Sequence, residues 1–122
     1  MKTITQNLQT LKSSLEDKPQ INIVVVTKTR SPEEIQEAIA AGATSIGENR
    51  VQEAEQKFPK IQNIDKAEKR LIGRLQSNKA KKAVKIFDTI DSVDSLKLSQ
   101  KISKAAESIV SKILTAFFAL FD

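Results

Sequence analysis

Residues 21–49 read INIVVVTKTRSPEEIQEAIAAGATSIGEN, and this stretch decides the fold of the chain. The opening run, residues 21–26, is short, aliphatic and rich in β-branched side chains, which is typical of a strand buried on both faces of a parallel sheet. Thr27 and Lys28 follow at a polar tip, and a second short strand is expected at residues 44–47, before Glu48 and Asn49. With a helix between the two strands, the pattern predicts one βαβ unit.

The helix of this unit carries start and stop signals. Ser31 is suited to cap it, Pro32 sits where a missing N–H costs nothing, and Glu34 completes a Ser-x-x-Glu capping box. Gly42 is the expected stop. The aliphatic residues 35, 38 and 39 share one helix face, which we therefore expect to be buried.

Lys28 is the first candidate for chemistry, because it stands at the carboxyl end of the first strand. Active groups of barrels and open α/β sheets lie at this end of the strands, where the loops converge. A neutral amine in such a place forms a Schiff base with an aldehyde. The alternative from spacing alone is an ordinary solvated loop lysine, since lysines usually lie in water.

The composition limits the classes of function. The chain has 122 residues, of which 39% are hydrophobic, and this fits one small domain. It has no cysteine and no histidine, which excludes disulfides, thiol nucleophiles, histidine-based metal sites and triads that need an imidazole. The lack of cysteine fits a reducing cytoplasm, and the polar residues 1–10 show no signal peptide. The net charge of +5 suits an anionic partner without naming one.

The rest of the chain repeats the alternation of strand and helix. Aliphatic residues at helical spacing predict a leading helix over residues 1–15, and further helices are expected near 51–57, 77–87 and from 94 onward. Strands are expected at 69–73 and 89–93. Ser77 and Asp94 are the expected caps of the last two helices. Inward-facing positions of the final helix are Leu96, Ile102, Ala105, Ala106 and Ile109. The alternation predicts an α/β fold with a parallel sheet and right-handed crossovers.

The last segment breaks this rhythm. Residues 113–121 are almost wholly apolar and include Phe117, Phe118 and Phe121. A membrane-spanning helix needs about 20 apolar residues, so we expect no span here. A fifth strand and an extension of the preceding helix are the two open interpretations.

Four short strings then resemble a known family. They are VVTKT at residues 25–29, GENRVQE at 47–53, IGRLQSNK at 72–79 and SVDSL at 92–96, each at or just after an expected strand. In this order they look like the pyridoxal phosphate homeostasis protein family, also called the YggS or PROSC family, whose fold is the TIM-like barrel of the alanine racemase N-terminal domain. The resemblance runs from the leading helix to about residue 108.

The resemblance implies a cofactor and a site. Lys28 matches the lysine that holds pyridoxal 5′-phosphate (PLP) as a Schiff base, and Asn49 matches the asparagine beside the cofactor. Site-lining positions implied in the same way are Thr27, Gly73, Leu75 and Ser77. The family resembles a carrier or regulator of the cofactor more than an enzyme with a firm substrate. The implied function is therefore PLP binding in intracellular PLP homeostasis, without catalysis.

Two local departures from the family pattern bear on these expectations. Arg30 stands where the family commonly has a second lysine, and an arginine cannot take over the cofactor as a Schiff base. Residues 69–71, Lys-Arg-Leu, replace the aromatic residues and histidine that commonly precede the Ile-Gly pair. The first departure affects any transfer of the cofactor between lysines, and the second affects local packing.

The length is the largest departure. A complete (β/α)8 barrel takes about 250 residues, whereas this chain supplies a leading helix and four βα units, the N-terminal half of such a barrel. We expect a truncated or frame-shifted gene product, with a partial PLP-binding domain at residues 1–112 and an apolar tail at 113–122. The expected phosphate cradle belongs to the missing half, which leaves Arg30, Arg50 or Arg74 for the phosphate. The fourth or fifth strand is expected to have an unpaired edge, which favours self-association. The alternative to a truncated product is a chain that pairs with a second copy, so that two half-barrels make one.

Two other functions are weighed against this one. A racemase-like PLP enzyme needs a second acid–base group on the opposite face of the cofactor, and none can be assigned in a chain without histidine. A basic nucleic-acid-binding module is suggested by the lysines of residues 79–85 and the net charge. The chain lacks a recognised binding motif and an aromatic stacking platform, so a solvated lysine face is the preferred interpretation.

Overall fold

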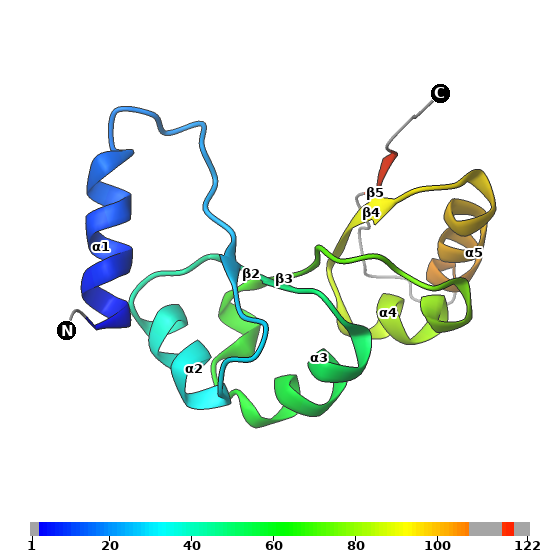
Figure 1. The fold of residues 1–122 in the computed structure, drawn as a ribbon, viewed down its shortest axis with the longest axis horizontal. Coiled ribbons are helices and arrows are strands. Elements are labelled where there is room, and N and C mark those ends of the chain that lie inside the picture. Colours follow the sequence, from blue (N-terminus) through cyan, green and yellow to red (C-terminus); the bar gives the residue numbers. More distant parts are fainter. Residues whose placement is uncertain (1–2, 108–115, 119–122) are drawn as a thin grey trace.

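Five parallel strands, joined by helices, form one sheet in the order β1-β2-β3-β4-β5 in the computed structural model, which describes residues 3–107 and 116–118 (Figure 1). The strands are β1 (Val25–Val26), β2 (Ser45–Glu48), β3 (Glu68–Leu71), β4 (Thr89–Val93) and β5 (Ala116–Phe118). The helices are α1 (Ile4–Ser14), α2 (Pro32–Ala40), α3 (Val51–Lys57), α4 (Ala80–Ile86) and α5 (Leu96–Ala106), with short 3-10 turns η1 (Phe58–Lys60), η2 (Ile64–Lys66) and η3 (Ser77–Lys79). Each strand pairs in parallel with the strand that follows it in the sequence. This pairing confirms the predicted α/β fold with a parallel sheet.

The signals around α2 act as the sequence predicts. The Ser31 hydroxyl accepts the Glu34 N–H at 3.1 Å, and the Glu34 carboxylate accepts the Ser31 N–H at 3.1 Å, which closes the capping box. Pro32 occupies the first turn. Gly42 follows the helix with a φ of +105°, a left-handed conformation that L side chains rarely adopt. The chain therefore turns directly from α2 into β2.

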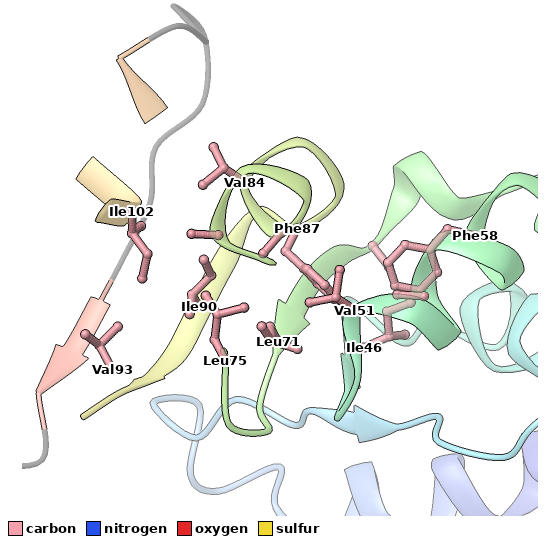
Figure 2. Close-up of a cluster of buried hydrophobic side chains, with 14 of the residues drawn as sticks. Ile46, Val51, Phe58, Leu71, Leu75, Val84, Phe87, Ile90, Val93 and Ile102 are labelled. Atoms are coloured by element: carbon pink, nitrogen blue, oxygen red, sulfur yellow. The ribbon is translucent and has the colours of Figure 1, made fainter. Parts of the chain in front are cut away.

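The main core lies between the sheet and the helices (Figure 2). Ile46, Leu71 and Ile90 enter it from three neighbouring strands and are fully buried. Phe58 and Phe87 meet edge to face with ring centroids 5.6 Å apart, a preferred geometry for aromatic pairs. Figure 1 shows α2, α3 and α4 along one side of the sheet. This packing fixes the strand ends that carry the candidate site.

The leading helix packs separately from this main core. Leu8 of α1 joins Ala38 and Ala43 in a second buried cluster. Leu11, one of the aliphatic positions that predicted this helix, is 45% exposed. Only part of the apolar stripe of α1 is therefore covered.

The first strand is shorter and more exposed than predicted. The structure assigns only Val25–Val26 to β1, whereas the sequence predicted residues 21–26 with both faces buried. Val26 is 48% exposed and Ile21 is 44% exposed. The physical reason is the position of β1, which pairs with β2 on one side and has no strand on its other side among the described residues.

Two predicted caps are wrong. Ser77 lies inside η3. Gln76 precedes η3 and Lys79 precedes α4, and neither side chain makes a capping hydrogen bond in the described chain. Ser95 rather than Asp94 caps α5, because its hydroxyl accepts the Leu98 N–H at 3.1 Å. Leu96, which was predicted to face inward, is 70% exposed, and the buried residues of α5 are Leu98 and Ile102.

The apolar tail lies mostly outside the described residues, as does Ile109. Within it, Ala116–Phe118 forms β5 and pairs in parallel with β4. Among the helices of the described part, none is long and apolar enough to span a bilayer.

Candidate functional site

Lys28 lies on a tight turn at the carboxyl end of β1. The Thr27 N–H donates to the Gly47 carbonyl at 3.0 Å, which continues the pairing with β2. The Arg30 N–H then donates to the Thr27 carbonyl at 3.0 Å and closes the turn. Thr29 has a φ of +63°, an uncommon conformation for a residue other than glycine. Lys28 is exposed, and its amine has no partner among the described residues.

A buried cluster of charges lies beneath this turn. The Lys57 ammonium donates to the Thr27 carbonyl at 2.8 Å and to carboxylate oxygens of Glu48 at 2.9 Å and Glu53 at 3.0 Å. The Thr27 hydroxyl donates to the same Glu48 oxygen. The Glu53 carboxylate accepts the Thr29 N–H at 2.7 Å. Side chains from β2 and α3 thus hold both ends of the segment that carries the lysine.

Two members of the cluster, Glu48 and Lys57, are shielded from water, which strengthens their contact, whereas 29% of the Glu53 side chain is accessible. Glu48 is 0% exposed and Lys57 is 8% exposed. The hydrogen bond from the Thr29 N–H is the main cause that lowers the pKa of Glu53, and the contact with Lys57 adds to it. Glu53 is therefore held in its ionised form.

Asn49 and Gly73 meet at the ends of the next two strands. A Cβ built on Gly73 would lie 2.8 Å from the Asn49 Cα, so only glycine allows this approach of the two backbones. The Asn49 Oδ1 atom is buried and lacks a hydrogen-bond partner among the described residues. An unsatisfied buried acceptor of this kind suits a ligand that donates a hydrogen bond.

A groove of about 770 Å³ opens where β2, β3 and β4 end. Three predicted site residues, Asn49, Leu75 and Ser77, line it, whereas Lys28, Thr27 and Gly73 are not among the lining residues. The other lining residues are Arg50, Val51, Gln52, Arg74, Gln76, Lys79, Asp94, Ser95, Lys97 and Leu98. Cationic side chains therefore outnumber the single carboxylate, and the groove suits an anion.

The three arginines expected near the phosphate separate into two groups. Arg50 and Arg74 line the groove, and Arg74 lies 3.6 Å from Asp94. Arg30 instead pairs with Glu34 at 3.7 Å on the surface of α2. The structure thus brings two of the three candidates to the groove.

Sequence reasoning missed Glu48, Glu53 and Lys57 as parts of this site. A weak signal was present, because Glu53 and Lys57 have the i, i+4 spacing of a helical ion pair. That spacing usually marks a solvated surface pair, and the sequence does not show that Lys57 reaches under β1. The involvement of Glu48 depends on the pairing of β1 with β2.

Comparisons with known proteins identify what the chain is similar to. It is 41% identical over 91 residues to a pyridoxal phosphate homeostasis protein of Synechocystis, a match that covers 75% of this chain and 42% of the relative. A protein of the same name from Buchnera aphidicola is 32% identical over 123 residues, covering 94% of this chain and 54% of the relative. The chain matches part of a YggS/PROSC-family protein.

The chain is also similar to solved structures of PipY. PipY of Synechococcus elongatus with PLP bound matches with a TM-score of 0.83 and 40% identity over 88% of this chain and 50% of PipY. PipY without PLP gives a TM-score of 0.85 and 38% identity over 93% of this chain and 52% of PipY. A scan against protein-family models finds no match. The chain spans about half the length of the curated relatives it matches.

Proposed function

We propose that this chain binds PLP for intracellular PLP homeostasis and that Lys28 holds the cofactor as a Schiff base. The observation that carries the proposal is an exposed amine on a fixed turn at the carboxyl end of a parallel strand. The PLP-bound PipY structure, which is similar over 88% of this chain, supports the choice of cofactor. A role as a carrier or regulator, without catalysis, is part of the same proposal.

The chemistry needs a primary amine and an aldehyde and no further reactant. Lys28 would hold the cofactor through its Nζ, and bound PLP would supply the aldehyde with which a neutral amine forms a Schiff base and releases water. The cofactor itself supplies the electron sink of PLP chemistry. Asn49 fits a position beside it, because its buried Oδ1 lacks a partner among the described residues and is free to accept a hydrogen bond.

In this proposal the basic groove binds the phosphate group of PLP. Arg50 and Arg74 line the groove together with Lys79 and Lys97. Arg74 is strongly exposed, with 86% of its side-chain surface accessible. Exposed cations of this kind contribute only about 0–1 kcal/mol per pair, so we expect weak phosphate binding that falls steeply with salt.

The test is titration of the chain with PLP, followed by borohydride reduction and mass mapping of the modified lysine. We expect modification at Lys28, and its loss in Lys28→Ala without transfer to another site. Lys81→Ala is the matched control, because Lys81 is an exposed lysine on α4 outside the groove lining. Wild-type protein that shows no modified Lys28 at saturating PLP would refute the proposal.

Two further parts of the proposal concern location and assembly. The cytoplasm is the proposed location, supported by a sequence without cysteine. The proposed partner in self-association is a second copy of this chain, which would pair along the edge of β1. The exposure of Val26 on that edge supports self-association along β1.

A further inference from the structure

The turn that carries Lys28 needs support from outside itself. Thr29 adopts a left-handed backbone conformation that costs a non-glycine residue free energy. Within the turn, the Arg30 N–H bonds to the Thr27 carbonyl at 3.0 Å, and the Thr29 hydroxyl bonds to the Lys28 carbonyl at 2.5 Å. These local contacts leave the Thr29 N–H to be satisfied by another part of the molecule.

The buried cluster supplies that support at two backbone atoms. Glu53 accepts the Thr29 N–H at 2.7 Å, and Lys57 donates to the Thr27 carbonyl at 2.8 Å. An ammonium group has three hydrogens, and Lys57 has three acceptors, on Thr27, Glu48 and Glu53. Glu53 and Lys57 therefore bond to the backbone of the turn, and Glu48 bonds to Lys57.

The chemical nature of the cluster argues against a role in packing alone. Burying charged groups costs free energy, and apolar side chains of similar volume often stabilise a core as well or better. Here the charged groups bond to the backbone of Thr27 and Thr29, the residues directly before and after Lys28. A hydrogen-bonded brace of this kind fixes the orientation of a segment, which apolar packing does less well.

We propose that Glu48, Glu53 and Lys57 are positioning residues, which hold the turn from Thr27 to Arg30 so that the Lys28 amine faces an incoming aldehyde. The inference rests on the proposed function, because it explains how the fold prepares the lysine for PLP. Glu53 is the most direct member, since it alone of the three bonds to the N–H of Thr29.

The test compares Glu53→Ala and Glu53→Gln with the control Glu55→Ala in the full chain. Glu55 lies on the same helix, is exposed, and pairs with Lys82 at 3.6 Å, away from the turn. One measurement is hydrogen exchange of the Thr29 amide by NMR without PLP. The other is the fraction of Lys28 modified by PLP and borohydride, measured by mass spectrometry.

Glu53→Ala is expected to speed Thr29 exchange about tenfold or more and to lower Lys28 modification about tenfold, as misplaced reacting groups do. Glu53→Gln keeps an acceptor oxygen for the Thr29 N–H and is expected to restore most of both. Glu55→Ala is expected to change neither. Glu53 is not part of the hydrophobic core and 29% of its side chain is accessible, so these substitutions remove no core packing.

Two results would overturn the inference. One is wild-type Lys28 modification in Glu53→Ala, and the other is an equal loss in Glu53→Ala and Glu53→Gln. A wild-type chain that takes up no PLP at Lys28 would refute the proposed function instead. Exchange at Thr29 would then decide the inference by itself: faster exchange in Glu53→Ala supports the brace, and unchanged exchange overturns it.

Discussion

At Gly73 the chain after β3 touches the backbone of Asn49, and a Cβ there would lie 2.8 Å from the Asn49 Cα. Gly73→Ala must therefore move backbone, and we expect a loss of about 1–3 kcal/mol in the free energy of unfolding, as overpacking typically causes. Urea denaturation measures this loss. The displacement of Asn49 should also weaken PLP binding, which the titration reads separately.

Gly47→Ala is the matched control for Gly73→Ala. A Cβ on Gly47 would meet the side-chain ends of Ile72 and Val24, each at 3.0 Å, and such ends can shift. We expect a smaller loss of stability than in Gly73→Ala. Equal losses in the two variants would show that the contact with Asn49 does not determine the loss in the free energy of unfolding.

The stability of the chain in acid should depend on Glu53. The Thr29 N–H first, and Lys57 next, lower the pKa of Glu53 from its ordinary 4.5. A depressed pKa adds stability above about pH 4.5, which is lost as the pH falls from this value through the lower pKa of the folded chain. Glu53→Gln should thus be less stable than wild type at about pH 7, and the gap should narrow as the pH falls below 4.5 through the lower pKa of the folded chain. Thermal unfolding over a series of pH values measures the gap, and a gap independent of pH would contradict the expectation.

At the scale of single residues, the sequence predicted the position of Lys28, while its role stays a prediction. The aliphatic run before it places Lys28 after a strand, and in the structure it follows β1. Glu48 and Lys57 were not found, because their contact depends on how α3 packs under β1 and β2. Roles created by tertiary packing leave little trace in one sequence.

The cap of α2 can be tested as an element. Ser31→Ala removes the oxygen that accepts the Glu34 N–H at 3.1 Å, and loss of such a cap costs about 0.5–2 kcal/mol. We expect a lower melting temperature. Ser103→Ala, in the exposed part of α5, is the control and should change stability little, because alanine favours the helix interior. A larger effect of Ser103→Ala would contradict the capping argument.

Element types were easier to predict than element ends. Each expected helix and strand before residue 108 is present, and β4 has the predicted bounds, Thr89–Val93. The predicted start of a helix was wrong where two neighbouring polar residues can each cap it, as Asp94 and Ser95 can before α5. They also failed at β1, because an apolar run does not show whether its strand lies inside the sheet or at its edge.

At the scale of the whole molecule, β1 at one end of the sheet is the surface that we expect to bind a second copy. Val26 is 48% exposed there, and β1 pairs only with β2 among the described strands. A lysine on an edge strand opposes pairing with another chain, so Val26→Lys should shift the chain toward the monomer in sedimentation equilibrium. Leu96→Lys is the control, since Leu96 on α5 is even more exposed, at 70%, but lies away from this edge. If Leu96→Lys dissociates the assembly and Val26→Lys does not, the contact belongs to α5, and the two copies do not meet along β1.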